Sequence, residues 1–336
     1  MTLAAAADPP TRGASALLEV DGLTTVFGAK GELTAVDDVS FAVHAGETLG
    51  LVGESGSGKS VTALSIMRLV ESPGRIAAGA IRLRGRNLLA ISEREMREVR
   101  GGEIALIFQE PMTALNPVFS IGSQVAEALL AHKCVDRRGA RDAVVELLES
   151  VRIPDPNLRY DDYPHQLSGG LRQRVMIALG LACRPALLIA DEPTTALDAT
   201  LQAQILDLLR DLKARFELSV LLITHDLGVM AETADRIAIM YAGRIVEQGA
   251  VRDIFRRPKH PYTRGLLASL PGGTPGARLK AIEGTVPPLG QLPPGCAFAP
   301  RCPDRMNRCD DAPPSVAPIE PGHDVRCYLH DAEGFG

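Results

Sequence analysis

No tryptophan occurs among the 336 residues, other aromatic residues are few, and apolar runs are short. The longest apolar run, Val175 to Cys183, ends at Arg184 and Pro185, far below the roughly 18 residues that a membrane-spanning helix needs. A chain of this kind that works at a membrane must dock onto the helices of another protein. Without tryptophan, aromatic stacking on a ligand must come from another aromatic residue.

The sequence also lacks an excess of basic residues. Its formal charge of -5 and pI near 5.9 argue against a surface built to neutralise nucleic-acid phosphates, so we expect no nucleic-acid partner. No basic residue precedes Arg12, so the N-terminus lacks the charged start of a secretory signal. We therefore expect residues 1–15 to be a disordered leader and the compartment to be reducing.

Cysteine is scarce until the end of the chain, where four of the six cysteines fall: Cys296, Cys302, Cys309 and Cys327. In a reducing compartment disulfides are a weak interpretation, and metal binding is the stronger one. The segment Pro258 to Pro321 holds 14 of the 24 prolines, which cannot sustain long helices or central strands. Residues 251–336 are therefore predicted to form a separate, loop-rich domain, whereas Cys134 and Cys183 are interpreted as ordinary thiols.

The apolar residues, 46% of the chain, are enough for a large core, and their pattern alternates between strands and helices. Buried strands are predicted at Thr48 to Val52, Ala186 to Ala190 and Val220 to Thr224, with helices between them. This alternation predicts an α/β fold with a mostly parallel sheet. Residues 112–165 have few strand signals and are predicted to be a helical insertion. A hairpin is predicted around Ala242 and Gly243.

A phosphate-binding loop pattern follows the first buried strand and opens a helix: Gly53, Glu54, Ser55, Gly56, Ser57, Gly58, Lys59 and Ser60. Small residues let backbone N–H groups wrap phosphates at a helix N-terminus, Lys59 adds positive charge, and the Ser60 hydroxyl can ligate Mg²⁺. The alternative, a glycine-rich turn that binds nothing, is disfavoured because both pattern and context fit. The loop predicts ATP and Mg²⁺ as ligands.

Two acids, Asp191 and Glu192, end a second apolar strand, at the edge of a parallel sheet where ligands bind. Asp191 would hold Mg²⁺, and Glu192 would polarise the attacking water. Taken alone, such a pair could equally be a solvated loop or a helix cap. Beside the phosphate-binding loop, it predicts nucleotide hydrolysis.

Ser168, Gly169 and Gly170 form a turn within the sequence LSGGLRQ, which leads into the apolar helical run from Val175. Ser168 and free N–H groups at a helix start make an anion site, although a serine cap with flexible glycines is the ordinary alternative. With this motif, about two dozen residues before the paired acids, the sequence resembles the ABC ATPase family. That resemblance implies that the motif contacts the γ-phosphate held by a second ATPase subunit.

Three further positions match the family in order. The resemblance implies that Gln109 senses Mg²⁺ and the attacking water, that Asp198 couples two ATP sites across a dimer, and that His225 contacts the γ-phosphate. Phe27, at the end of an early strand, is the predicted adenine-stacking residue, and it could equally belong to the core. A lone glutamine or histidine is more often structural than catalytic, so each position depends on its place among the other motifs.

Segments 257–267 and 294–303 look like the C-terminal extension of the ATPases of dipeptide and oligopeptide importers. That resemblance implies an iron–sulfur cluster, of the 4Fe-4S type, on the four C-terminal cysteines, which are separated by 5, 6 and 17 residues. Zinc ribbons usually have tighter spacing, but a zinc site and four free thiols remain alternatives.

The resemblance to importers implies a peripheral protein on the cytoplasmic face of the cell membrane. Its partners would be two permease subunits, a homologous second ATPase and an extracellular or periplasmic substrate-binding protein. The cargo could instead be another small solute such as a metal chelate. ABC ATPases of DNA repair, chromosome organisation or translation are disfavoured because the chain has one cassette, no heptads and trailing cysteines. A non-hydrolysing regulatory subunit is disfavoured by the presence of Glu192 and His225.

Overall fold

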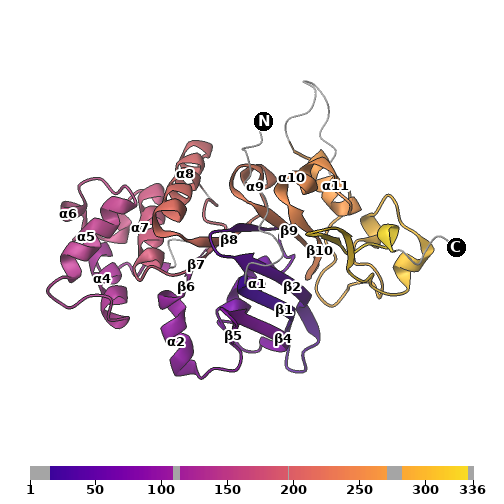
Figure 1. Ribbon diagram of the computed structural model, residues 1–336, viewed down its shortest axis with the longest axis horizontal. Helices are drawn as coiled ribbons and strands as arrows, with labels where there is room; N and C mark the ends of the chain where they lie inside the picture. Colours follow the sequence, from indigo (N-terminus) through magenta and orange to yellow (C-terminus); the bar gives the residue numbers. More distant parts are fainter. Residues whose placement is uncertain (1–15, 109–113, 196, 271–281, 332–336) are drawn as a thin grey trace. The chain divides into compact units, whose positions relative to one another are not determined.

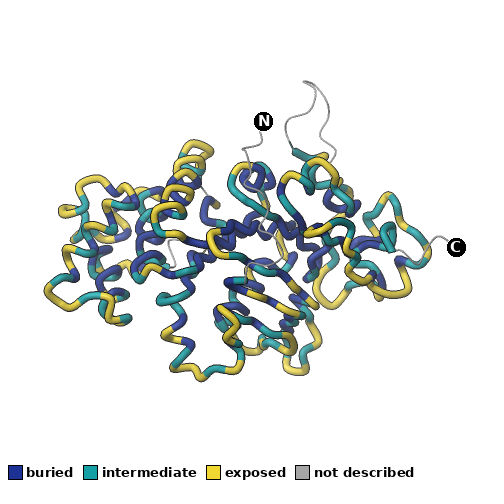
Figure 2. The backbone as a smooth tube through the Cα atoms, in the orientation of Figure 1, coloured by how far each residue is buried: buried dark blue, intermediate teal, exposed yellow. Residues whose placement is uncertain are grey.

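The computed structural model describes residues 16–108, 114–195, 197–270 and 282–331. The chain divides into two compact units, one formed by the chain up to Leu89 and from Thr224 onward, the other by Ala90–Ile223 (Figure 1). Each unit has its own buried strands and core (Figure 2). The helices and strands of each unit are described in turn.

The first unit begins with an antiparallel sheet in the order β2-β1-β4-β5. Its strands are β1 (Ala16–Phe27), β2 (Leu33–His44), β4 (Arg75–Leu83) and β5 (Arg86–Asn87). The apolar side chains of Val39, Phe41 and Val43 alternate along β2 and are buried, which is the pattern of a strand with one face on the core.

A second set of strands in this unit carries the predicted nucleotide loop. Strand β3 (Thr48–Val52) pairs in parallel with β9 (Arg236–Tyr241), and β9 pairs antiparallel with β10 (Arg244–Ala250). The β9–β10 turn places Ala242 at φ 45° and Gly243 at φ 85°, as a two-residue hairpin of type I′ needs. The predicted strand and hairpin are both confirmed. Helix α1 (Lys59–Ile66) and helix α9 (Leu227–Thr233) complete this part.

The second unit contains parallel strands in the order β8-β7-β6. They are β6 (Ile104–Ile107), β7 (Leu187–Asp191) and β8 (Ser219–Thr224), all built largely of apolar residues as expected for strands buried on both faces. The helices around them are α2 (Glu93–Gly102), α4 (Ile121–Ala131), α5 (Ala140–Ser150), α6 (Pro156–Arg159), α7 (Gly169–Leu181) and α8 (Ala199–Phe216). Residues of α4, α5, α7 and α8 share one apolar core with Ile107 and Leu188.

The predicted α/β fold is confirmed, with a parallel part, an antiparallel part and a set of helices. Helices α4, α5 and α6 lie inside the predicted helical insertion at 112–165. In the part of the chain that the structure describes, no helix is both long enough and apolar enough to cross a membrane.

The C-terminal extension packs within the first unit and adds two strands to its sheet. Strand β12 (His323–Val325) pairs antiparallel with β10, and β11 (Ala317–Glu320) pairs with β12. Helices α10 (Val251–Arg256) and α11 (Pro261–Ala268) precede them, and short 3₁₀ turns occupy 299–301, 307–310 and 328–330. The proline-rich segments 282–298 and 302–316 contain no long helix, as predicted.

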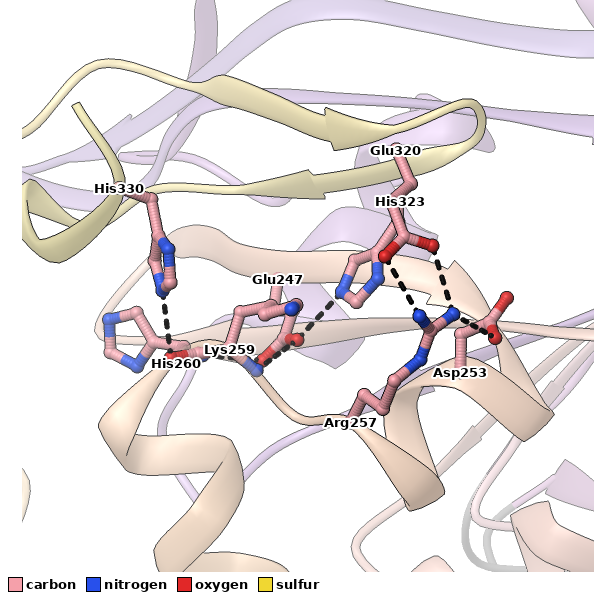
Figure 3. Close-up of polar contacts among 8 residues, drawn as sticks. All are labelled: Glu247, Asp253, Arg257, Lys259, His260, Glu320, His323 and His330. Carbon is pink, nitrogen blue, oxygen red and sulfur yellow. Dashed lines mark hydrogen bonds and ion pairs between the residues drawn. The ribbon is translucent and has the colours of Figure 1, made fainter. Parts of the chain in front are cut away.

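Glu247 of β10 joins this extension to the sheet from a fully buried position (Figure 3). Its carboxylate accepts hydrogen bonds from the backbone N–H groups of Lys259 (2.7 Å) and His260 (2.9 Å) and from Nε2 of His323 (2.8 Å). Burial disfavours the ionised carboxylate, but the hydrogen bond from His323 and the backbone donors outweigh it and lower the pKa of Glu247. The buried charge is therefore fully accommodated by the extension.

Two further side chains, Arg257 and His330, hold the same region (Figure 3). Arg257 makes two hydrogen bonds to Glu320, at 3.0 and 2.9 Å, and one to Asp253 at 3.1 Å. Nε2 of His330 lies 3.3 Å from the carbonyl oxygen of Lys259. The arginine pairs are exposed to solvent and contribute little, so the buried carboxylate dominates the attachment.

His260 caps helix α11 with a ring nitrogen. It is 1% exposed, and its Nδ1 accepts a hydrogen bond from the backbone N–H of Tyr262 at 3.0 Å. Burial lowers the pKa of His260 to about 4, against the partial opposing effect of Glu247 and with smaller contributions from Arg264 and His330. The cap therefore requires the neutral imidazole.

We predict that His260→Asn removes a pH dependence of stability while keeping an acceptor at the helix cap. A lowered folded-state pKa stabilises the protein above the unfolded value near 6.5, and this stability is lost as pH falls towards about 4. Between pH 7 and pH 5, the unfolding free energy of the original protein should fall by about 2 kcal/mol more than that of the variant. Urea unfolding followed by circular dichroism measures this, and equal losses in both proteins would contradict it.

Candidate functional site

Residues 53–60 of the first unit contain a tight loop, 53–58, between the buried strand β3 and helix α1, and the first two residues of that helix. A Cβ at Gly53 would lie 2.2 Å from the carbonyl oxygen of Met240, so no side chain fits there. Gly58 has φ 102°, and a Cβ on it would lie 2.6 Å from the carbonyl oxygen of Ala35. Both glycines are therefore required by the path of the backbone.

Lys59 begins helix α1, and its ammonium stays at the loop. Its Nζ donates hydrogen bonds to the carbonyl oxygens of Gly53 (2.8 Å) and Glu54 (3.0 Å), and the residue is only 5% exposed. Ser60 is the next residue and is exposed, as are Ser55 and Gly56 at the tip of the loop. Ser57 is buried, and its backbone carbonyl accepts a hydrogen bond from Gly243 N at 2.9 Å.

This loop fits a triphosphate on several counts. Gly58 is the N-cap of α1 and makes no side-chain hydrogen bond to the first turn of the helix. Glycines leave the backbone accessible, and the lysine ammonium supplies positive charge beside the helix N-terminus. The loop can therefore hold phosphates, and Ser60 offers a hydroxyl oxygen of the kind that Mg²⁺ prefers.

Glu54, the second residue of the loop, is tied to the C-terminal extension. Its backbone N–H donates to the Tyr262 hydroxyl at 3.1 Å, and its carboxylate pairs with Nη1 of Arg301 at 3.0 and 3.2 Å. Sequence reasoning missed Tyr262 and Arg301. They lie 208 and 247 residues from Glu54, and no local pattern marks them, although segments 257–267 and 294–303 had been singled out for their resemblance.

Two other predicted residues belong to this unit. Phe27 ends β1 in a half-buried position with its ring close to Gly74, where a Cβ would lie 2.5 Å from Phe27 Cε1. His225 is exposed and follows β8, directly before Asp226, which caps α9 by accepting from Gly228 N at 2.7 Å. Both side chains are accessible enough to touch a ligand, and their roles stay predictions.

In the second unit, the paired acids lie at the carboxyl end of β7. Asp191 is 8% exposed and is the last residue of the strand, and Glu192 follows at φ 46°, a left-handed conformation that costs energy for glutamate. That turn lets Glu192 N donate to the Ile223 carbonyl at 2.9 Å, while Oε2 accepts from the Thr195 hydroxyl at 2.7 Å. The backbone and the side chain of Glu192 are thus both oriented by hydrogen bonds.

Ser168 of the same unit is exposed and caps helix α7, with its Oγ accepting from Leu171 N at 3.4 Å. Gly169 is exposed, whereas Gly170 is buried next to Leu201 of α8. Asp198 caps α8 by accepting from the backbone N–H groups of Thr200 (3.0 Å) and Leu201 (2.9 Å). Ser168 and Asp198 both lie at helix N-termini, where the helix dipole attracts negative charge. Capping a helix is therefore compatible with the role near a nucleotide that is predicted for each of them.

Gln109 lies outside the described residues, so its predicted place beside the nucleotide stays a prediction.

The predicted iron–sulfur site is wrong. Across residues 282–331, which hold all four C-terminal cysteines, and in the rest of the described chain, no group of three or more His, Cys, Asp or Glu side chains is placed to hold a metal ion. Burial also raises the pKa of Cys302 and Cys327 to about 11 and raises that of Cys296, which favours thiols over the thiolates that bind metals. All four are free cysteines, and the zinc alternative fails on the same geometry.

Two family models match this chain, one in the cassette and one in the C-terminal extension. Residues 36–195 match the family described as ABC transporter, and residues 246–309 match the oligopeptide/dipeptide transporter C-terminal region. The oligopeptide transport ATP-binding protein AppD of Bacillus subtilis is 52% identical over 95% of this chain and 98% of AppD. The dipeptide transport ATP-binding protein DppD of Haemophilus influenzae is 50% identical over 93% of this chain and 95% of DppD. Neither name mentions a metal cluster.

Solved structures share the cassette. The ATP-binding cassette MJ0796, in a dimeric post-hydrolysis state bound to ADP and Pi, has a TM-score of 0.62 at 26% identity and covers 70% of this chain and 99% of its own. CbiO1 of Clostridium perfringens, part of an ABC transporter complex, has a TM-score of 0.63 at 25% identity, with coverages of 72% and 91%. The phosphate-binding loop, the paired acids and the fold agree with these matches, and the chain therefore belongs to the ATP-binding proteins of the ABC transporter family.

Proposed function

We propose that this chain is the ATP-hydrolysing subunit of a membrane importer of dipeptides and oligopeptides. The observation that carries the substrate class is the C-terminal region, residues 246–309, which matches that of oligopeptide/dipeptide transporters. Relatives about half identical over nearly the full chain are named as oligopeptide and dipeptide transport ATP-binding proteins. The cassette would occupy residues 16–250 and the peptide-transporter extension residues 251–336.

ATP would be bound by the loop at 53–60, where backbone N–H groups and Lys59 hold the phosphates and Phe27 stacks on the adenine. Ser60, Asp191 and Gln109 would hold Mg²⁺, which neutralises the charge that develops on the phosphates. Glu192 would act as the base that takes a proton from the attacking water. The hydrogen bond from Thr195 at 2.7 Å supports this role, since it orients the carboxylate without neutralising it.

The proposed assembly has two ATPase subunits facing one another. Each chain carries two anion-binding helix starts, the loop at 53–60 and the turn at 168–170, and one ATP needs only the first of them from its own chain. The second, with Ser168, Gly169 and Gly170, would contact the γ-phosphate on the partner, with His225 and Asp198 completing the shared sites. Closure of the pair around two ATP molecules would move the attached permease helices, and hydrolysis would reopen it.

Attachment to a permease is supported by large apolar side chains exposed on the second unit. Val118 and Phe119 are 70% and 54% exposed, and Leu158 is 78% exposed. Their segments lie side by side, because Ile121 N donates to the Asp162 carbonyl at 2.9 Å and Gly122 N to that of Tyr160 at 2.9 Å. Large exposed apolar side chains on neighbouring segments fit contact with a protein partner. Two permease subunits, an external substrate-binding protein and a peripheral position on the cytoplasmic membrane face complete the proposal.

We predict that Glu192→Gln abolishes ATP turnover and peptide uptake but not ATP binding. The amide cannot accept the proton from water, while the loop at 53–60 and Lys59 are unchanged. Turnover should fall by about 100-fold or more in the complex that co-purifies with this chain. Thr195→Val should lower ATP turnover less, because it removes only the hydrogen bond that orients the Glu192 carboxylate. ATPase activity of Glu192→Gln within a few-fold of the original would show that Glu192 is not the base.

We predict that Ser168→Arg impairs hydrolysis at the partner's ATP and leaves ATP affinity at this chain's own loop unchanged. The arginine would block the helix start that receives the partner's γ-phosphate. The measurement combines Ser168→Arg with a lysine knockout in the phosphate loop of one subunit at a time and follows residual hydrolysis. If Ser168→Arg abolishes the activity that remains when the partner's loop is disabled, but spares that remaining when Lys59 is disabled, the turn acts within its own chain.

A further inference from the structure

Glu54 is a carboxylate inside a loop that is built to hold phosphates. It is the second residue of the loop at 53–60, and its side chain is 30% exposed. A carboxylate this close to a triphosphate repels it unless a cation offsets the charge. The structure supplies that cation from the C-terminal extension, as Nη1 of Arg301 at 3.0 and 3.2 Å from the two carboxylate oxygens.

Arg301 is held rigidly in place. Its side chain is 5% exposed, its Nη1 lies 3.4 Å from the Tyr241 hydroxyl, and its guanidinium lies 5.8 Å from the centre of the Tyr241 ring. The other guanidinium nitrogens donate to the carbonyl oxygens of Glu283 (3.0 Å) and Ile282 (3.4 Å). A guanidinium with so many fixed partners cannot follow Glu54 if the loop moves, so it determines where the carboxylate rests.

Tyr262 restrains the backbone of the same loop residue. Its hydroxyl accepts the N–H of Glu54 at 3.1 Å, and its ring is fully buried between Tyr241 and Phe298, with ring centres 4.7 and 5.4 Å away. Burial raises the pKa of Tyr262, so the hydroxyl stays protonated. The helix that carries Tyr262 is capped by His260 and anchored through Glu247.

We propose that Arg301 and Tyr262 are positioning residues for ATP binding: Arg301 neutralises Glu54 and Tyr262 fixes its backbone, so that the loop presents its N–H groups to the phosphates. The inference rests on the proposed role of the loop at 53–60 in holding ATP. Through these two contacts, the C-terminal extension acts directly on nucleotide binding by the cassette. Any change that shifts the extension alters ATP affinity.

The test measures Mg-ATP affinity of the full chain by equilibrium binding of a fluorescent ATP analogue. Arg301→Met should weaken binding by about tenfold, because the buried partner of Glu54 is lost and its charge is left facing the phosphates. Adding Glu54→Gln to Arg301→Met should restore affinity to within about threefold, because the repelling charge is then gone. Arg305→Met is the matched control, since Arg305 lies in the same extension but pairs with Asp310 at the surface, 53% exposed, and should leave affinity unchanged.

Two outcomes overturn the inference. Unchanged affinity in Arg301→Met would show that the ion pair does not influence the loop. Weakened affinity that Glu54→Gln fails to restore would show that Arg301 only maintains the fold of the extension. Lys59→Ala distinguishes failure of this inference from failure of the proposed function. If Lys59→Ala leaves ATP binding intact, the loop itself is not the ATP site. If Lys59→Ala abolishes ATP binding while Arg301→Met leaves ATP affinity unchanged, only the positioning role is rejected.

Tyr262→Phe tests the second contact without disturbing the aromatic cluster. It removes only the oxygen that accepts from Glu54 N, and should weaken ATP binding by about threefold. The melting temperature should change no more than in Tyr328→Phe, a half-buried tyrosine of the same extension whose hydroxyl donates to the Ala312 carbonyl at 2.9 Å. ATP affinity equal to that of the original chain would remove Tyr262 from the proposal.

Discussion

Burying the carboxylate of Glu247 would cost several kcal/mol if nothing replaced its water, and the C-terminal extension supplies the replacement. Two backbone N–H groups, of Lys259 and His260, and the ring of His323 converge on it from parts of the chain 12 to 76 residues away. Because the buried Glu247 carboxylate needs all three donors, the start of α11 and the strand β12 must both pack against β10. The position of the whole extension follows from this requirement.

That position is what brings the extension within reach of the nucleotide loop. Helix α11 begins at Pro261, beside the backbone that Glu247 binds, and the next residue, Tyr262, reaches Glu54. The aromatic rings of Tyr241, Tyr262 and Phe298 then pack together, with Tyr241 and Phe298 edge to face, and Arg301, three residues after Phe298, completes the ion pair. One buried charge on β10 thus positions a second, partly exposed charge pair at the phosphate loop. The contacts of Glu247 therefore place the extension where Arg301 can pair with Glu54.

The local parts of this structure were predictable from sequence, and the long-range parts were not. The loop at 53–60 and the strand β3 are encoded by consecutive residues, so pattern and context suffice to identify them. The same holds for the turn at Ala242 and Gly243, whose backbone angles depend on those two residues. Glu247, by contrast, stands in a strand where an acidic residue normally faces solvent, and Arg301 is one arginine among many. Their roles depend on partners far along the chain. The cysteines show the opposite failure: the residue types suggested a metal site, but a site requires side chains placed around one point, which spacing alone does not establish.

We infer that the extension and the phosphate loop form one cooperative structure held through Glu247. Hydrogen–deuterium exchange of the full chain carrying Glu247→Leu tests it most directly, because exchange reports local opening residue by residue. We expect faster exchange both in the extension, at residues 259–263 and 323–325, and in the loop at residues 53–58. Faster exchange confined to the extension, with the loop unchanged, would contradict it.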